Sequence, residues 1–533
     1  MQLKWKNAYD FLADSVKANS QRVFFVRENK SYADLLRMVQ RRAVLLKKRF
    51  DIKRGDVVGL LSENIPEFIA SYFAVVSLGA KSLMLDAQLA KGEIKNMLAK
   101  TKAKLIIAQK KFWNDSDSDL PLLDIQNIDD TDESEFVPEN IELDEIASLS
   151  FTSGSTGKSK IVGLSHKNVV ALAQGAELYS PVIKPGYMFY GFLPLNHVYG
   201  FVINMIAPLT LNCSLLLQQT LNPKLFLEDF KKFHPEVVPA VPRVWEVFQK
   251  KITDGYKEKR AYWILRFVVA TRGFWRAIGL GGLVRKITKP VFDTFGGKVK
   301  VLVSAGATLK PSTRKFYERL GFSVGDCYGL TETTGPSNFN FQFRLNDGTM
   351  HYAGPLPGNE VQIRNADKDG VGDIYVRGLL VMPGYIENEE ANKDAFDKDG
   401  WFKTGDVGVF DKRGRLTVKA RKKQIIVLDS GKNVYPDELE DLYLQNDAVL
   451  MAAVFERVIQ GKTVAFGVFQ VKPETTMTEL SLLIAASNLK IAPYKWVTHF
   501  AMTTEELPMT SAQKIKHHEV IANLDAGKYP NMK

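Results

Sequence analysis

Leu149-Ser-Phe-Thr-Ser-Gly-Ser-Thr-Gly-Lys-Ser-Lys160 joins an apolar, strand-like run to a loop of glycines, hydroxyls and lysines. Gly154 and Gly157 let the backbone bend and approach an anion closely. Hydroxyl donors and positive charges are supplied by Ser153, Ser155, Thr156, Lys158 and Lys160. The loop therefore predicts a site for the phosphates of a nucleotide.

The end of the loop is similar to a P-loop, but its surroundings do not fit that motif. Thr152 stands where a P-loop has its first glycine, and a P-loop lysine opens a helix. Here Ile161-Val-Gly-Leu164 continues as β-favouring chain, and Ser165 is the next good N-cap candidate. The P-loop interpretation fails on this context, whereas a flexible turn is the alternative for the loop taken by itself.

Length and composition describe a typical soluble enzyme. The 533 residues exceed what one hydrophobic core usually serves, so two or more domains are expected. Cys213 and Cys327 are too few for a disulfide framework, which favours a reducing compartment. Residues 1–7 have no apolar signal core behind their charges. We therefore expect a cytoplasmic location, with peripheral attachment at the inner face of the membrane as a variant of it.

One long stretch, between Lys184 and Lys224, contains no formally charged residue. Its length alone would allow a transmembrane helix. The stretch is broken by polar residues, glycine and proline at Pro194, Asn196, Gly200, Asn204, Pro208 and Asn212. We therefore expect a buried strand, a helix and a second strand that line an apolar site.

The net charge is +11, from 71 basic and 60 acidic residues, which suits an anionic substrate or surface. No nucleic-acid module is recognised, so no nucleic-acid partner is expected. Residues 259–289 mix basic with aromatic side chains, as at Arg260, Tyr262, Trp263, Arg266, Phe267, Arg272, Phe274, Trp275, Arg276, Arg285 and Lys286. This pattern favours peripheral contact with an anionic lipid interface, and the alternative is a packed helical insertion with a solvated basic face.

Helical and strand-like patterns alternate from residue 1 to about 110, which is typical of a layered α/β domain. Helices are predicted at 32–46 and 65–78, and a buried strand at Val57–Leu61. The acid-rich segment 114–145 is predicted to be a surface loop. Later strands are expected at 372–377, 415–419 and 463–471, with a helix that begins at Pro436.

From Phe151 onward, the phosphate loop resembles that of the adenylate-forming (ANL) superfamily, which includes acyl-CoA synthetases, luciferases and peptide-synthetase adenylation domains. Five further segments resemble the family's motifs in the same order: Tyr328-Gly-Leu-Thr-Glu332, Gly400-Trp-Phe-Lys-Thr-Gly-Asp406, Arg421-Lys-Lys, Ser430-Gly-Lys-Asn-Val-Tyr-Pro436 and Leu507-Pro-Met-Thr-Ser-Ala-Gln-Lys514. These motifs cover most of the chain from residue 149 onward. Val241-Pro-Arg243 is similar to a segment of long-chain fatty acid-CoA ligases in particular.

The resemblance implies an α/β fold in two parts. A large layered N-terminal domain of α/β subdomains, with a small β-barrel-like part, would span 1–420. A hinge would lie at 421–424, and a small mobile α+β domain at 425–533 would carry the catalytic lysine.

The resemblance also implies how the nucleotide would be held. The phosphate loop would close over the β- and γ-phosphates of ATP through Thr152, Ser153, Gly154, Ser155, Thr156, Gly157, Lys158 and Lys160. Glu332 would ligate Mg²⁺, and Thr331 would contact the α-phosphate. Tyr328, followed by Gly329, would stack on adenine beside the close-approach segment Ser304, Ala305, Gly306 and Ala307.

The C-terminal motifs imply further roles. Asp406 and Arg421 would bind the ribose hydroxyls, and Lys514 would be the adenylation lysine, which spans the substrate carboxylate and the nucleotide. Lys423 would be the hinge residue. Gly431 would line the pantetheine tunnel, where a residue without a side chain leaves room.

Three histidines need separate interpretation. His197 matches a family histidine that borders the acyl site, although a structural role is the alternative. His517 stands where the family usually has arginine, and Gln513 replaces the customary glycine, which affects the expected flexibility of the lysine loop. His517 and His518 have no cysteine or acidic residue at ligand spacing, so no metal site is expected there.

The implied activity is ATP-dependent activation of a medium- or long-chain fatty acid to acyl-AMP, followed by transfer to coenzyme A. An acyl-acyl-carrier-protein synthetase or acyl-AMP ligase would use a different acceptor, so an acyl carrier protein is a further candidate partner. An aryl or succinylbenzoyl acid-CoA ligase would use a shorter acid. A non-catalytic binding relative is a third alternative, against which the presence of Lys514 argues.

Overall fold

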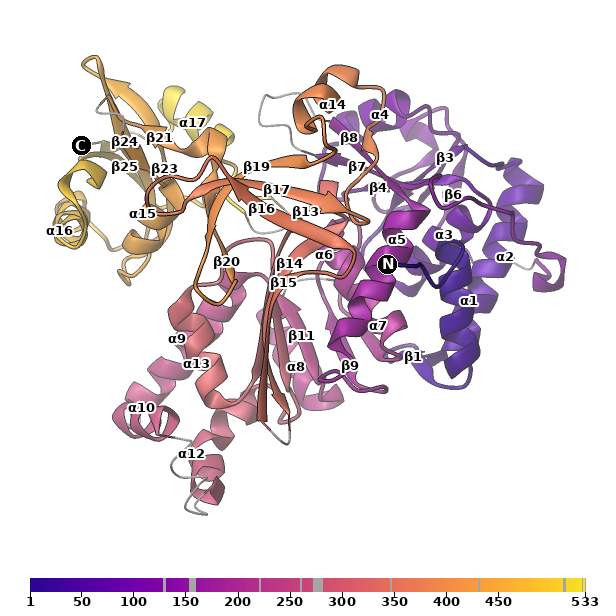
Figure 1. The fold of residues 1–533 in the computed structure, drawn as a ribbon, viewed down its shortest axis with the longest axis horizontal. Coiled ribbons are helices and arrows are strands. Elements are labelled where there is room, and N and C mark those ends of the chain that lie inside the picture. Colours follow the sequence, from indigo (N-terminus) through magenta and orange to yellow (C-terminus); the bar gives the residue numbers. More distant parts are fainter. Residues whose placement is uncertain are drawn as a thin grey trace. The chain divides into compact units, whose positions relative to one another are not determined.

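The computed structural model describes residues 1–127, 131–152, 160–219, 222–258, 261–271, 281–345, 348–429, 432–510, 514–529 and 531–532. The chain forms two compact units (Figure 1). The first contains Met1–Val361 and Val376–Phe402, and the second contains Gln362–Tyr375 and Lys403–Lys533. The predicted hinge at 421–424 concerns movement and stays a prediction.

A nine-stranded sheet in the first unit has the order β15-β14-β13-β12-β11-β9-β10-β1-β2. Its strands are β1 Val23–Phe25, β2 Lys30–Ser31, β9 Met188–Gly191, β10 Ser214–Leu217, β11 Val237–Ala240, β12 Val301–Ser304, β13 Ser323–Leu330, β14 Gly335–Leu345 and β15 Gly348–Pro355. The central strands from β13 to β1 pair in parallel. Their carboxyl ends therefore meet at one edge, where ligands bind in open α/β sheets.

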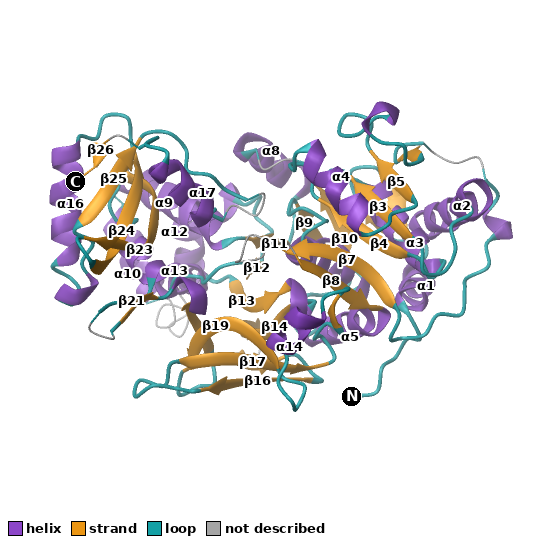
Figure 2. Ribbon diagram, turned by 90° about the horizontal axis from the view of Figure 1, so that it is seen from above, coloured by secondary structure: helices purple, strands orange, loops and turns teal. Residues whose placement is uncertain are grey.

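The second large sheet has seven strands in the order β18-β8-β7-β4-β3-β5-β6 (Figure 2). They are β3 Val57–Leu61, β4 Lys81–Leu85, β5 Leu105–Ala108, β6 Leu122–Asp124, β7 Ile146–Thr152, β8 Lys160–Ser165 and β18 Gly384–Tyr385. The predicted strand at Val57–Leu61 is confirmed. The prediction that 114–145 is only a loop was wrong at β6, because buried Leu123 and Ile125 hold this strand in parallel against β5.

The helices of the first unit cover both sheets. They are α1 Ala8–Asn19, α2 Tyr32–Phe50, α3 Pro66–Ser77, α4 Lys91–Lys100, α5 His166–Ala176, α6 Val198–Phe201, α7 Ala207–Thr210, α8 Pro223–Phe233, α9 Pro242–Glu258, α10 Tyr262–Ala270, α12 Gly281–Thr294, α13 Pro311–Leu320 and α14 Glu389–Ala395. Single 3₁₀ turns lie at η1 Asp115–Asp117, η2 Glu133–Glu135, η3 Glu177–Tyr179 and η5 Thr331–Thr333.

Helix termini follow the expected capping chemistry. The two predicted N-terminal helices are confirmed as α2 and α3. A capping box between Ser31 and Asp34 starts α2, which continues four residues beyond the predicted end and stops at the left-handed Asp51. Ser165 caps α5 as predicted, accepting a hydrogen bond from the Asn168 backbone.

The uncharged stretch after Lys184 folds as predicted into a strand, a helical segment and a second strand. The helical segment consists of α6, the π-helix η4 (Val202–Ile206) and α7, between β9 and β10. These residues belong to the main apolar core, which also contains Leu60 of β3 and Phe189 of β9 and so joins the two sheets. Within the described ranges, no helix has both the length and the apolar character that a membrane crossing requires.

A four-stranded sheet of order β16-β17-β19-β20 takes the place of the predicted β-barrel-like part. Its strands are β16 Asn359–Arg364, β17 Gly372–Gly378, β19 Phe402–Phe410 and β20 Leu416–Arg421. The strands predicted at 372–377 and 415–419 are confirmed as β17 and β20. The turn η6 (Lys422–Gln424) follows directly.

The rest of the second unit is α+β. A second four-stranded sheet has the order β23-β24-β25-β26, from strands Val449–Ile459, Lys462–Val471, His499–Thr503 and Asn531–Met532. The other elements are β21 Ile426–Val427, β22 Asn433–Val434, α15 Pro436–Tyr443, α16 Met477–Asn488, η7 Pro493–Lys495 and α17 His517–Asp525. The predicted helix start at Pro436 and the strand at 463–471 are confirmed.

Candidate functional site

The phosphate loop connects two antiparallel neighbours, β7 and β8. Thr152 at the end of β7 is the register partner of Lys160 at the start of β8, so the loop begins and ends at one point of the sheet. The residues between them, 153–159, lie outside the described part of the chain. The predictions for Ser153, Gly154, Ser155, Thr156, Gly157 and Lys158 therefore remain predictions.

Lys160 and Glu332 are connected through the side chain of Tyr385. The Lys160 ammonium lies 4.5 Å from the centroid of the Tyr385 ring, a cation–π contact. Tyr385 Oη donates a hydrogen bond to Glu332 Oε1 over 3.0 Å. Tyr385 belongs to β18, which pairs with β8 opposite Val162. The structure thus brings one end of the phosphate loop and the predicted magnesium ligand to the same place.

Glu332 sits in η5, directly after β13, and its backbone is fixed there. The Glu332 carbonyl accepts a hydrogen bond from Met382 N over 2.9 Å, and Thr334 donates from Oγ1 to the Leu380 carbonyl. A single carboxylate fits Mg²⁺ that is held largely by substrate phosphates and water. Among the described residues there is no group of three or more acidic, histidine or cysteine side chains that could hold a metal ion by themselves.

The predicted adenine segments lie at the carboxyl ends of β12 and β13. Ser304 pairs in parallel with Asp326, and Tyr328 pairs antiparallel with Asn338 of β14. Opposed residues share a face of a sheet, so these four side chains form one polar stripe. Ser304 Oγ and the Asn338 amide are buried and find no hydrogen-bond partner among the described residues. A polar ring docked on this face would supply partners for them.

Two glycines make close backbone approach possible beside Tyr328. A Cβ atom on Gly329 would lie 1.8 Å from the Gly335 carbonyl oxygen, which no side chain tolerates. Gly306, between Ala305 and Ala307, has φ +88°, in the left-handed region that favours glycine. Both predicted positions therefore require glycine for the local backbone.

The Asp326 carboxyl lies beside the adenine motif and is largely buried, with 18% of its side chain exposed. Burial raises its pKa to about 6, although Arg314 opposes the shift with Nη1 at 4.0 Å from Oδ2. Neighbouring Cys327 is also buried. A carboxyl group in such a place costs stability when it ionises.

His197 caps α6 and links the two large sheets. Its Nε2 lies 3.3 Å from Oδ2 of Asp86, which directly follows β4. Two residues later, Tyr199 Oη donates to the Val303 carbonyl over 3.0 Å and contacts that of Ala240 at 3.3 Å. The His197 segment is thereby held at the carboxyl ends of β11 and β12, beside the adenine segments. Its predicted role at the acyl site remains a prediction.

In the second unit, Asp406 and Arg421 are register partners on β19 and β20. Arg421 Nε lies 2.8 Å from Asp406 Oδ1, and the aspartate is 4% exposed while the arginine is 49% exposed. The pair thus presents a guanidinium held by a buried carboxylate. Lys423 lies exposed in η6, and Gly431 lies outside the described ranges.

The segment that carries Lys514 is closed at its base by its own backbone. Thr510 N donates to the Lys514 carbonyl over 2.8 Å, and Lys514 N donates to Thr510 Oγ1 over 3.2 Å. Lys514 also interacts electrostatically with Arg421, Asp406 and Asp437. The predicted ribose pair and the predicted catalytic lysine are therefore near one another, while Gln513 lies in the undescribed segment 511–513.

A family model described as AMP-binding enzyme matches residues 12–386, well over half of the chain. The chain belongs to the AMP-binding enzyme family. Long-chain-fatty-acid–CoA ligase FadD15 of Mycobacterium tuberculosis is 36% identical over 324 residues, which are 58% of this chain and 52% of that protein. This AMP-binding enzyme thus spans about half the length of the curated relatives that it matches.

Solved structures show the same fold over nearly the whole AMP-binding enzyme. ATP-bound MatB from Rhodopseudomonas palustris has a TM-score of 0.78 at 20% identity, covering 99% of this chain and 100% of its own. O-succinylbenzoate coenzyme A synthetase (MenE) from Bacillus subtilis, in complex with ATP and magnesium ion, has a TM-score of 0.73 at 20% identity, covering 96% and 99%. The expected α/β fold is therefore confirmed.

Sequence reasoning missed two residues of this AMP-binding enzyme that contact positions singled out from the sequence, Tyr385 beside Lys160 and Glu332, and Glu440 beside His517. Tyr385 was not singled out, and the signal for it was only a glycine followed by an aromatic residue. The second is Glu440, whose Oε1 accepts hydrogen bonds from His517 Nε2 over 2.8 Å and from Val454 N over 2.7 Å. Burial alone would lower the pKa of His517, but the hydrogen bond to Glu440 and its charge outweigh burial and raise it.

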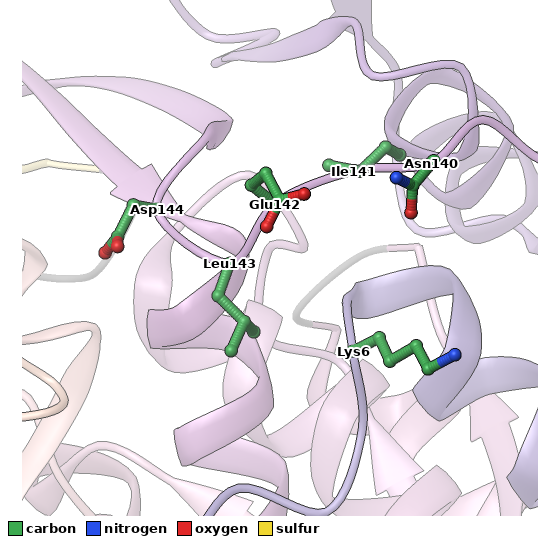
Figure 3. Close-up of a pocket in the computed structure, with 6 residues that line it drawn as sticks. All are labelled: Lys6, Asn140, Ile141, Glu142, Leu143 and Asp144. Atoms are coloured by element: carbon green, nitrogen blue, oxygen red, sulfur yellow. The ribbon is translucent and has the colours of Figure 1, made fainter.

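A cavity of about 470 Å³ lies elsewhere in the first unit (Figure 3). It is lined by Lys6 and by residues 140–144, in the segment between η2 and β7. None of the predicted site residues lines it. The cavity is thus separate from the contacts among Lys160, Tyr385 and Glu332.

Proposed function

We propose that this AMP-binding enzyme activates a medium- or long-chain fatty acid with ATP and transfers the acyl group to coenzyme A. The observation that carries the proposal is the connection from Lys160 through Tyr385 to Glu332. It supplies a cation and a carboxylate at the mouth of a loop whose composition suits phosphate. The family membership supports the same chemistry.

In the first step, a carboxylate oxygen of the acid attacks the α-phosphorus of ATP, and the bond to pyrophosphate breaks. The products of this step are acyl-AMP and pyrophosphate. Negative charge shifts onto the phosphate oxygens, so positioning and cations carry the catalysis. Lys160 would help to hold the phosphates, and Thr331 and Glu332 would face them. Mg²⁺, held by Glu332, would neutralise phosphate charge.

In the second step, the sulfur of coenzyme A attacks the acyl carbonyl carbon, AMP leaves, and the thiol proton passes to solvent. Arg421, fixed by buried Asp406, would bind the ribose hydroxyls. Lys514 would serve the first step, by holding the substrate carboxylate next to the nucleotide. A rotation of the C-terminal domain about 421–424, with Lys423 as the hinge residue, would present a different face of that domain for the second step. Gly431 would then line the path of the pantetheine.

The substrate class is proposed from two observations. FadD15, by its printed name, is a long-chain-fatty-acid–CoA ligase. In addition, the uncharged stretch from β9 to β10 contributes to a large apolar core close to the strand ends. An apolar wall suits an alkyl chain, because each buried methylene contributes about 0.8 kcal/mol.

The test is pyrophosphate release from ATP and Mg²⁺ with acetate, benzoate, O-succinylbenzoate, octanoate and palmitate. We expect octanoate and palmitate to give the highest kcat/KM, and acyl-CoA to accumulate when coenzyme A is added. If product accumulated only with an acyl carrier protein, that protein and not coenzyme A would be the acyl acceptor. Preference for benzoate or O-succinylbenzoate would replace the substrate class, and release with no acid would overturn the proposal.

A further inference from the structure

Helix α10 presents an apolar face to solvent. Trp263, Ile264 and Phe267 are 71%, 54% and 60% exposed, and they lie on one side of the helix together with exposed Ala270. On the opposite side, Leu265 is 2% exposed and belongs to the main core. The helix is therefore anchored by its inner side, and its outer side carries large apolar groups that water solvates poorly.

The helices that pack around α10 are basic on their surfaces. Figure 1 shows α9, α10, α12 and α13 grouped in one region of the first unit, and α10 contacts each of the other three. Their exposed basic residues are Arg243, Lys250, Lys251 and Lys257 of α9, Lys286 and Lys289 of α12, and Lys315 and Arg319 of α13. The acidic residues on the surface of the same helices, in their described positions, are Asp254, Glu258 and Asp293, and Asp254 and Asp293 pair with Lys257 and Lys289.

We infer that this surface, defined by Trp263, Ile264 and Phe267 of α10 together with the exposed lysines and arginines of the helices that contact α10, binds the anionic surface of a lipid membrane. A helix that lies in the interface plane inserts its apolar side among the acyl chains, while basic side chains around it meet the lipid phosphates. Tryptophan suits this position because its ring is amphipathic. The inference goes beyond the proposed function and does not depend on it.

Charge decides between a membrane and a second copy of the chain as the occupant. Two copies joined through this surface would bring their basic residues together, on a chain that already carries a net charge of +11. An anionic bilayer removes that repulsion and turns each lysine into an attractive contact.

The experiment is sedimentation of the full-length protein with vesicles of phosphatidylcholine, alone or mixed with phosphatidylglycerol. We expect the protein to bind the mixed vesicles, with an affinity that falls at high salt. Its affinity for vesicles of phosphatidylcholine alone should be lower by about tenfold or more. The double variant Trp263→Ser/Phe267→Ser is expected to lose at least about tenfold in vesicle affinity. The double variant Lys250→Glu/Lys251→Glu is expected to lose its preference for phosphatidylglycerol.

The matched control is Leu482→Ser/Leu489→Ser, which removes two exposed apolar side chains of 68% and 77% exposure at α16 and just after it. This control should bind vesicles like the wild type. Quenching of tryptophan fluorescence by brominated lipid gives a second readout, which Trp263→Phe should diminish without loss of binding. All α10 variants should release pyrophosphate from soluble octanoate at the wild-type rate, if the proposed function holds.

Three results would overturn the inference. They are equal vesicle binding by Trp263→Ser/Phe267→Ser and the wild type, equal binding to both kinds of vesicle, and self-association in solution that the Trp263→Ser/Phe267→Ser variant abolishes. Failure of octanoate turnover in the wild type would count against the proposed function alone.

Discussion

Tyr385 Oη donates to Glu332 Oε1 over 3.0 Å, and the face of the same ring meets the Lys160 ammonium at 4.5 Å. Three elements that are far apart in the sequence, β8, η5 and β18, thus share one tyrosine. The tyrosine therefore contacts a cation through the face of its ring and a carboxylate through its hydroxyl group. In the proposed reaction, those two charges would face phosphate oxygens and Mg²⁺.

Tyr385→Phe keeps the ring under Lys160 and removes only the hydrogen bond to Glu332. A bond of this kind contributes about 0.5–1.5 kcal/mol, so we expect kcat/KM for pyrophosphate release to fall about three- to tenfold. The Mg²⁺ concentration for half-maximal rate should rise, because the carboxylate loses its orientation. Tyr494→Phe, at a tyrosine that is 38% exposed, is the control. An unchanged Mg²⁺ titration would contradict the assigned position of Glu332.

Gly329→Ala is expected to disrupt the adenine segment. The added Cβ would lie 1.8 Å from the Gly335 carbonyl oxygen, so the β13–β14 pair must move apart. We expect a loss of about 1–3 kcal/mol of stability or more, measured as a lower thermal midpoint, together with weaker AMP binding. Gly92→Ala is the matched control, because its Cβ meets nothing within 4 Å. Equal midpoints for both variants would refute the crowding argument.

Asp326→Asn is expected to stabilise the protein at neutral and alkaline pH. The Asp326 carboxyl ordinarily ionises near pH 3.8 but in the fold at about 6, so the folded state binds more protons between these values. Wild-type stability therefore falls as the pH rises through this window, and the neutral amide avoids a cost of about 2–3 kcal/mol. Thermal midpoints from pH 5 to 8 should show a gain that grows with pH. A gain independent of pH would contradict the raised pKa.

Local periodicity predicted the elements well because each of them is decided by neighbouring residues. Val57–Leu61 is apolar throughout and lies in a parallel sheet, and Ser31 with Asp34 marks the start of α2. The missed features depend on partners far along the chain. Tyr385 reaches Glu332 across 53 residues, and Glu440 reaches His517 across 77. Such pairs form only when the chain has folded, so no local sequence pattern predicts them.

His517→Arg tests whether the histidine acts as a weaker substitute for a permanent cation. The pKa of His517 is raised by Glu440, so the bridge stabilises the fold fully below about pH 6.5 and is lost as the pH rises through the folded pKa. Arginine stays charged, so the variant should keep its thermal midpoint as the pH rises through the folded pKa of His517, where the wild type declines. The variant His517→Gln carries no charge at this position, so it should lack the rise in thermal midpoint that the charged bridge gives the wild type at low pH. Parallel pH profiles for wild type and His517→Arg would exclude a charged His517–Glu440 bridge.

Lys514→Ala separates the two half-reactions. Lys514 lies near Asp406 and Arg421, on a segment closed by its backbone bonds with Thr510, so its removal takes away a cation and leaves that closure intact. Pyrophosphate release should fall by about a hundredfold or more, because charge stabilisation in the first transition state is lost. Thioester formation from supplied acyl-AMP and coenzyme A should stay within about threefold of wild type. Lys516→Ala, at a lysine paired with Glu519, is the matched control and should retain both half-reactions. If Lys514→Ala slowed both half-reactions equally, the lysine would support the segment's structure and not the adenylation step, since only a step-specific contact can separate the two rates.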